Sequence, residues 1–142
     1  MLRDYGLLPA IESFCKKVNA TKTLEISIDD KTNGKRYHNI IETTLYRVGL
    51  EMINNTVKYA HAGNIQISLT EKSNILYFTY KDNGQGFDYE KKKNDINKGL
   101  GLNNMLNRVN SINGSCEIKS TPGNGFQAIL EIPLKYLQAL EL

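Results

Sequence analysis

Three polar residues, Glu51, Asn55 and Lys58, are spaced so that a single helix would carry them in one column. At about 100° per residue they fall within an arc of about 60°, and apolar residues occupy the opposite half of the same helix. An acid, an amide and a base in such a column could bind a phosphate group and a metal ion. The same pattern also fits an ordinary solvent-exposed helix face.

A second polar stretch, Asp82-Asn83-Gly84-Gln85-Gly86, directly follows an alternating segment over residues 75–81 that predicts a strand. A carboxylate at a strand end can accept a hydrogen bond from the exocyclic amine of adenine, whereas guanine carries a carbonyl oxygen there. It could equally cap its own turn. Gly84 and Gly86 would let the backbone approach a bound base closely, and Asn83 is interpreted as a turn former.

The composition indicates one ordinary globular domain. The chain has 142 residues, 40% of them hydrophobic, and a net charge of +3 without a dense basic run, so nothing favours nucleic acid as a partner. Cys15 and Cys116 match no metal-binding spacing, and we expect them to be buried, reduced thiols. No apolar run reaches the ~18 residues of a membrane span, and the N-terminus has no signal-peptide pattern. We therefore expect a cytoplasmic domain without direct membrane contact.

Hydrophobic periodicity predicts both the elements and the fold class. The expected helices are 7–18, 39–60 and 99–112, and the expected strands are 24–29, 64–70, 75–81, 116–120 and 126–132. Gly63 is the expected C-cap of the second helix. Because hairpins outnumber crossover helices, we expect an α+β, two-layer sandwich with helices on one face of a mixed, mostly antiparallel sheet. A Gly-Lys-Ser/Thr sequence is lacking, which excludes a P-loop.

These stretches together resemble the ATP-binding domain of sensor histidine kinases. Glu51-x-x-x-Asn55-x-x-Lys58 resembles its N box, Asp82-x-Gly84-x-Gly86 its G1 box, and Gly99-Leu100-Gly101-Leu102 its G2 box. The resemblance covers roughly residues 2–134. It implies the Bergerat ATP-binding fold, shared with DNA gyrase, the Hsp90 chaperones and MutL, and a single ATP-binding domain over residues 1–142.

The resemblance implies a role for each residue of the N and G1 boxes. Asp82 would bind adenine, Asn55 would be the Mg²⁺ ligand, and Lys58 would reach a phosphate. Tyr59 is either a nucleotide contact or a packing residue. Glu51 would activate water for hydrolysis, as the matching residue does in gyrase-like relatives, or orient the water shell of Mg²⁺.

The G2 box and the segment before it would contribute to phosphate binding. Gly99, Leu100, Gly101 and Leu102 would offer backbone N–H groups at a helix N-terminus, where the helix dipole favours an anion. Lys98 would add positive charge beside them. Residues from about 87 to 98 would form the ATP lid.

The implied function is that of the catalytic domain of a two-component sensor histidine kinase of the nitrate-sensor-like subclass. Mg²⁺-bound ATP would be held for phosphoryl transfer to a His on a dimerisation domain that this chain lacks. The phosphate would then pass to the receiver domain of a response regulator. Neither His38 nor His61 has the sequence context of the phosphoacceptor, so the isolated chain is not expected to autophosphorylate. Its location would be the cytoplasm, whether as a free protein or as part of a membrane-bound kinase.

One departure from the family and two alternatives remain at this stage. The family usually has Gly-Thr in the last turn, where Gly125-Phe126 stands here, so the base pocket must be completed without that hydroxyl. The alternatives are a stand-alone serine kinase of the anti-sigma-factor type and a non-catalytic ATP-binding interaction module. A gyrase- or chaperone-like ATPase fits less well, because such machines need further domains.

Overall fold

The computed structural model describes residues 2–19, 24–92 and 101–135 of the chain. The elements in chain order are α1 (Leu2–Tyr5), α2 (Leu7–Val18), β1 (Glu25–Asp30), α3 (Asn39–Asn55), η1 (Thr56–Ala60), β2 (Asn64–Lys72), β3 (Ile75–Asp82), α4 (Tyr89–Lys92), α5 (Leu102–Asn110), β4 (Ser115–Ser120) and β5 (Phe126–Pro133). The strands form one sheet in the order β1-β2-β3-β5-β4.

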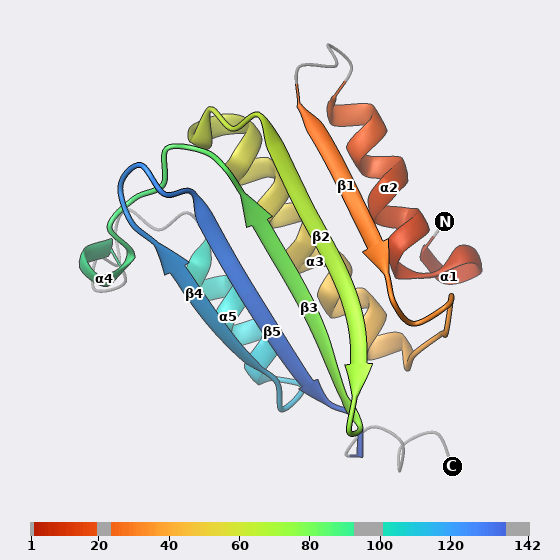
Figure 1. Cartoon of the computed structure of the whole chain (residues 1–142). Coiled ribbons are helices and arrows are strands. Elements are labelled where there is room, and N and C mark those ends of the chain that lie inside the picture. The colour runs from red at the N-terminus through yellow and green to blue at the C-terminus, as the bar shows by residue number, and fades with distance from the viewer. Residues whose placement is uncertain (1, 20–23, 93–100, 136–142) are drawn as a thin grey trace.

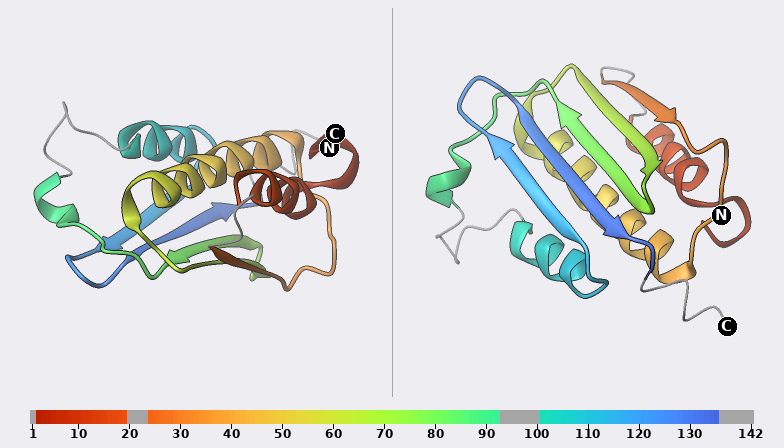
Figure 2. Two further views of the ribbon diagram at one scale, coloured as in Figure 1. Left: turned by 90° about the horizontal axis from the view of Figure 1, so that it is seen from above. Right: turned by 60° about the horizontal axis from the view of Figure 1, so that its bottom comes forward.

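The architecture is a two-layer α+β sandwich, as the sequence predicts. β1 runs parallel to β2, and the other neighbouring strands are antiparallel, so the sheet is mixed and mostly antiparallel. The helices α2, α3 and α5 pack on one face of the sheet, while α4 lies beyond the end where β4 and β5 join (Figure 1; Figure 2, left). Within the described ranges, no helix is long and apolar enough to cross a membrane.

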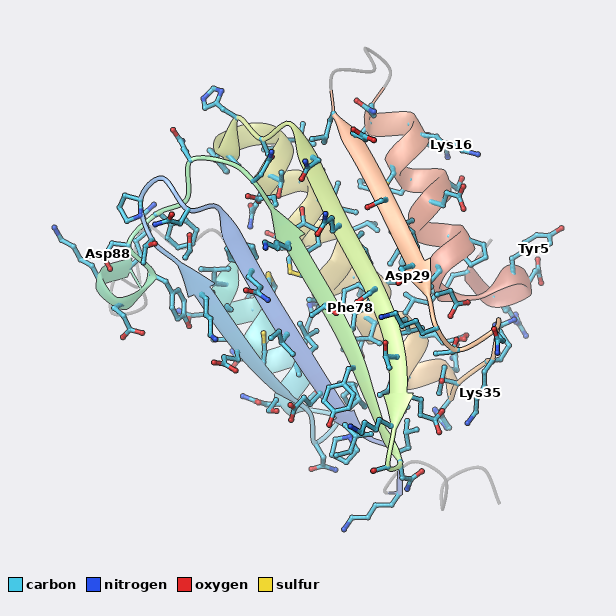
Figure 3. The ribbon with its side chains drawn as sticks, in the orientation of Figure 1. Tyr5, Lys16, Asp29, Lys35, Phe78 and Asp88 are labelled. Atoms are coloured by element: carbon cyan, nitrogen blue, oxygen red, sulfur yellow. The ribbon has the colours of Figure 1, made fainter. Side chains whose placement is uncertain are left out.

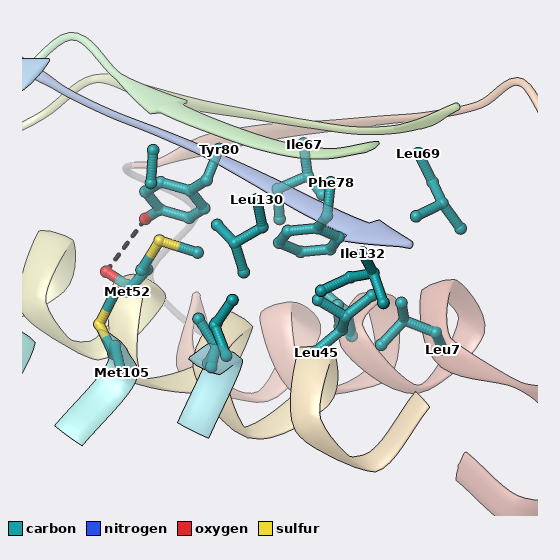
Figure 4. Close-up of a cluster of buried hydrophobic side chains, with 14 of the residues drawn as sticks. Leu7, Leu45, Met52, Ile67, Leu69, Phe78, Tyr80, Met105, Leu130 and Ile132 are labelled. Carbon is teal, nitrogen blue, oxygen red and sulfur yellow. Dashed lines mark hydrogen bonds between the residues drawn. The ribbon is translucent and has the colours of Figure 1, made fainter. Parts of the chain in front are cut away.

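The core lies between the helix layer and the sheet. Alternate residues of β3, including Leu76, Phe78 and Tyr80, point into it and are fully buried, as the period of a strand requires. They meet Leu45 and Met52 from the buried stripe of α3 (Figure 4). Asp82 follows Tyr80 by two residues and so lies on the same buried face of β3. Thr56, the first residue after α3, follows Met52 by four residues and so continues the buried stripe of that helix. The two elements that carry the N and G1 boxes therefore converge at one end of the core.

The end of the long helix differs from the prediction. The α-helix ends at Asn55, and the chain continues as one wider π-helical turn, η1. The prediction of Gly63 as the C-cap is wrong, because His61 takes the left-handed conformation that ends the turn, with φ 52°. Histidine is among the residues that tolerate this conformation comparatively well, so no glycine is needed. A π turn inside a helix is rare and is found mostly at functional sites.

A short helix, α1, precedes α2 and is held by side-chain contacts. The Arg36 side chain binds the carbonyl oxygens of Arg3 and Asp4 and forms an ion pair with Glu42, which is 4% exposed. The hydrogen bond to the Glu42 carboxylate raises the pKa of Arg36. This interaction fixes α1 and the loop before α3 to the start of α3. Lys35, on the same loop, forms an ion pair with Glu71 of β2 (Figure 3).

The two cysteines are reduced thiols, as predicted, but only Cys15 is fully buried. Burial raises the pKa of both thiols to about 11, which keeps them protonated and unreactive near neutral pH.

Candidate functional site

A cavity of about 590 Å³ opens where the end of α3, the loop after β3 and the start of α5 come together. Six of the residues predicted for the site line it: Asn55, Lys58, Tyr59, Asp82, Gly86 and Leu102. Its volume is in the range that small-molecule and cofactor sites occupy. These six residues, which are separated by up to 47 positions in the sequence, thus border one cavity.

Asp82 is a deeply buried polar residue of this cavity, at 3% exposure, as is Thr56. Its Oδ1 accepts hydrogen bonds from the backbone N–H groups of Gly84 (2.9 Å) and Phe126 (3.2 Å). Its Oδ2 accepts one from the Thr56 hydroxyl (2.8 Å). These three donors hold the carboxylate in one orientation at the cavity wall, where it can only accept hydrogen bonds from a ligand.

The loop after β3 is tied to the end of the long helix by two side chains. Gln85 binds Ala60 O through its backbone N–H (2.7 Å) and Tyr59 O through its side chain (2.5 Å). Asn83 Oδ1 accepts from the backbone N–H groups of Gly63 and Asn64, so this side chain joins the loop after β3 to the start of β2, and its role as a turn former stays a prediction. The loop and η1 therefore form one unit, and the relative positions of Asp82 and Lys58 depend on it.

Gly84 and Gly86 are required for contacts between protein backbones. A Cβ atom at Gly84 would lie 2.5 Å from Ala60 O, and Gly84 does not line the cavity. A Cβ atom at Gly86, which has a φ of +65°, would lie 2.3 Å from Thr121 O. Gly86 does line the cavity. The structural demand for both glycines thus comes from close approach of the loop to η1 and to the last turn, whereas their contact with a base stays a prediction.

The polar column of the N box is divided between two places. Asn55, Lys58 and Tyr59 border the cavity, and Tyr59 is 52% exposed, so it lies outside the buried core and its contact with a nucleotide stays a prediction. Glu51 borders a separate groove of about 280 Å³ between α3 and α5, together with Arg47 and Arg108 among others. Its predicted roles toward water or Mg²⁺ stay predictions.

The described part of the G2 box lies against Glu51. Gly101 has a φ of +75° and precedes α5, and a Cβ atom there would lie 2.2 Å from Glu51 Oε1. Leu102, the first residue of α5, lines the cavity. Lys98, Gly99 and Leu100 lie outside the described residues, as does the end of the predicted lid after Lys92.

No sequence pattern predicted that Phe87, Lys92 and Phe126 would border one cavity. Phe126 stacks on Phe87 with ring centroids 6.0 Å apart and meets Tyr80 edge to face at 6.1 Å, so aromatic rings form one wall. Lys92 Nζ lies 5.3 Å from the Phe87 ring centroid, and Asp88 Oδ1 accepts from the N–H of Lys91 in α4. Phe87 lies in the loop before α4 and Phe126 at the start of β5, and no local pattern predicts that two such distant rings share a cavity.

The donor set can be tested for a metal ion. Among the described residues, no group of three or more His, Cys, Asp or Glu residues could hold a metal by itself. The N box places the Asn55 amide at the cavity and the Glu51 carboxylate at the neighbouring α3–α5 groove. This set fits Mg²⁺, which keeps several waters and is usually bound by one or two protein oxygens plus substrate phosphates.

Comparison with known proteins points to one family. Residues 40–136 match the family described as histidine kinase-, DNA gyrase B- and HSP90-like ATPases. Over 133 residues the chain is 30% identical to the signal transduction histidine-protein kinase/phosphatase DegS of Brevibacillus brevis, covering 94% of this chain but only 34% of DegS. The chain thus spans about a third of that relative.

Solved structures share the fold. The histidine kinase domain of the blue-light-activated kinase EL346 from Erythrobacter litoralis superposes with a TM-score of 0.73 at 17% identity, covering 92% of this chain and 66% of that one. The catalytic domain of the histidine kinase ThkA gives a TM-score of 0.73 at 16% identity, covering 90% of both chains.

The fold is a helix layer packed on one face of a sheet, with a cavity of cofactor size beside the end of α3. The match over residues 40–136 makes the classification specific: the chain belongs to the histidine kinase-, DNA gyrase B- and HSP90-like ATPase family. The relatives named above are histidine kinases, so neither the serine kinase nor the interaction module is favoured.

Proposed function

We propose that this chain is the ATP-binding catalytic domain of a two-component sensor histidine kinase. The observation that carries the proposal is Asp82, a buried carboxylate oriented by three donors at the wall of a nucleotide-sized cavity. Such a group accepts the exocyclic amine of adenine and rejects the carbonyl oxygen of guanine. The similarity to DegS supports the proposal.

The phosphate groups would extend from the base pocket toward Lys58 and the start of α5. Lys58 is exposed at the cavity rim, where its ammonium group is free to move onto a phosphate. The first backbone N–H groups of a helix have no partner within the helix and favour an anion. Gly101 and Leu102 stand at that position of α5. We include Lys98, Gly99 and Leu100 in the proposed phosphate site because of the G2-box resemblance alone.

Asn55 would hold the Mg²⁺ ion through its amide oxygen, with Glu51 orienting water on the side of α3 that faces Gly101. The ion, when bound, neutralises charge on the phosphate oxygens. The protein then needs only to hold the γ-phosphate for in-line attack, because phosphoryl transfer depends mainly on positioning and electrostatics.

The phosphoryl acceptor would be a His outside this chain, on dimerisation helices that belong to the same kinase. His38 Nδ1 accepts from the N–H of Ile40 and so caps α3, and His61 ends η1. Both therefore have local structural roles. The phosphate would pass on to the receiver domain of a response regulator, in the cytoplasm, and the isolated chain would bind nucleotide without autophosphorylating.

Calorimetric titration with ADP, a non-hydrolysable ATP analogue and GDP tests the proposal. We expect adenine nucleotides to bind with a Kd of about 1–100 µM in the presence of Mg²⁺, and GDP at least about tenfold more weakly. Absence of adenine nucleotide binding by the folded chain would contradict the proposal. Phosphohistidine formed by the isolated chain on incubation with ATP would contradict the proposal that the phosphoacceptor His lies outside this chain.

Asn55→Ala is expected to remove the Mg²⁺ dependence of nucleotide binding. Without the amide oxygen the metal loses its protein ligand, so ADP affinity measured with Mg²⁺ should fall about tenfold, toward the value measured with EDTA. Asn54→Ala is the matched control, because Asn54 borders the α3–α5 groove and not the cavity. Equal Mg²⁺ enhancement in the wild type and in Asn55→Ala would show that the ion is held elsewhere.

A further inference from the structure

Three buried groups form a continuous hydrogen-bonded chain that starts at the cavity wall, where Asp82 and Thr56 lie, and ends at Tyr80. Thr56, Tyr80 and Asp82 are 3%, 0% and 3% exposed. The Thr56 hydroxyl lies 2.5 Å from the Tyr80 hydroxyl and 2.8 Å from Asp82 Oδ2. Both hydroxyls also lie 3.1 Å from the carbonyl oxygen of Met52, and the Tyr80 contact is drawn in Figure 4.

The hydrogens of this chain can be placed by counting donors. An ionised carboxylate only accepts, and it is the strongest acceptor within reach, so the single hydrogen of Thr56 goes to Asp82 Oδ2. The Tyr80 hydrogen is then shared between Thr56 Oγ1 and Met52 O. Burial raises the pKa of Tyr80 far above its usual range, so the phenol stays protonated and remains a donor. The chain therefore runs from Tyr80 through Thr56 to Asp82.

The two oxygens of Asp82 are left unequal by this arrangement. Oδ1 accepts two backbone N–H groups, from Gly84 and Phe126, and so is fully used. Oδ2 accepts only Thr56 from the described residues, and a carboxylate oxygen can accept about two hydrogen bonds. Because Asp82 lines the cavity, the remaining acceptor position of Oδ2 is the one available to a ligand.

We propose that Thr56 and Tyr80 are positioning residues that fix Oδ2 of Asp82 as an acceptor and thereby set the preference of the site for 6-aminopurines. The inference rests on the function proposed above and adds two residues to it. Thr56 reaches Asp82 from the end of α3, and Tyr80 supports Thr56 from β3. Neither side chain needs to touch the nucleotide; each acts through the carboxylate.

The test compares two ligands that differ only in the 6-amino group: ADP and purine riboside 5′-diphosphate, which carries hydrogen there. Thr56→Val keeps the shape of the side chain but removes the donor to Asp82. We expect ADP affinity to fall about tenfold in this variant, with the affinity for the 6-hydrogen analogue within about twofold of wild type. Thr56→Ser keeps the hydroxyl and should retain the wild-type ratio of the two affinities.

Tyr80→Phe is the second variant, and it serves alone if Thr56→Val does not fold in a thermal unfolding check. It removes only the donor behind Thr56, so we expect the same selective loss, about threefold for ADP. A loss of affinity that is equal for both ligands, or no loss for either, would overturn the inference while leaving the nucleotide site in place. Failure of the wild type to bind ADP would overturn the proposed function and this inference together.

Discussion

Asp82→Asn is expected to weaken ADP binding by at least about 100-fold while leaving the fold intact. The asparagine keeps one oxygen that can accept from the N–H groups of Gly84 and Phe126, so the loop stays anchored. Its amide nitrogen then replaces Oδ2, and the Thr56 hydroxyl can accept from it and donate to Met52 O. The adenine amine therefore faces the amide nitrogen of the asparagine, which is a donor and not an acceptor. The site also loses the negative charge of the carboxylate.

The measurement is calorimetric titration of both proteins with ADP and Mg²⁺, accompanied by thermal unfolding. Asp88→Asn provides the matched control, since Asp88 is exposed, lies six residues further on and caps α4 with an oxygen that asparagine also has. ADP affinity in Asp82→Asn equal to that of Asp88→Asn would show that the base is recognised elsewhere.

Gly86→Ala is expected to lower the free energy of unfolding by about 3 kcal/mol or more and to abolish nucleotide binding. Its φ of +65° already disfavours any side chain with a Cβ atom, and the added carbon would lie 2.3 Å from Thr121 O and 2.7 Å from Gly125 O. Both neighbours are backbone atoms, so relief requires the loop or the last turn to move. Either movement displaces Asp82 or the Phe126 wall.

Gly123→Ala separates the destabilisation caused by the positive φ from that caused by the clash with backbone atoms. Gly123 has a comparable φ of +82°, and a Cβ atom there meets nothing within 4 Å, so only the backbone penalty of about 1–2 kcal/mol should appear. Urea unfolding of the two variants measures the difference, which we assign to the clash. Equal destabilisation would mean that the turn over residues 121–125 moves aside at little cost.

The arrangement of the elements was largely predictable because each hydrophobic period reports burial along a single helix or strand. The periods of residues 7–18 and 75–81 gave helix and strand bounds within one residue of those of α2 and β3. The end of the long helix was not predictable in this way. The π turn changes the number of residues per turn only over Thr56–Ala60. The hydrophobic pattern of the sequence keeps a period of 3.6 residues through this segment, so it does not reveal the change.

The candidate site was predictable in its polar residues and not in its geometry. Asp82 and Asn55 stand out because polar side chains end an otherwise buried strand and helix. Glu51 was grouped with them by its angle on the helix and by the N-box resemblance, and neither shows which neighbouring element a side chain faces. In the structure Glu51 borders the α3–α5 groove, whereas the next residue, Met52, lines the cavity.

The sequence by itself determined the fold class, the family and the two elements that carry the polar boxes, because these depend on periodicity and on residues close together in the chain. Only the tertiary structure decided how Asp82 is held. Its donors come from Thr56, Gly84 and Phe126, up to 44 positions away. These contacts form where the buried stripe of α3 and the buried face of β3 end at the same level of the core. Packing between the helix layer and the sheet sets that level. No local sequence pattern reports this packing.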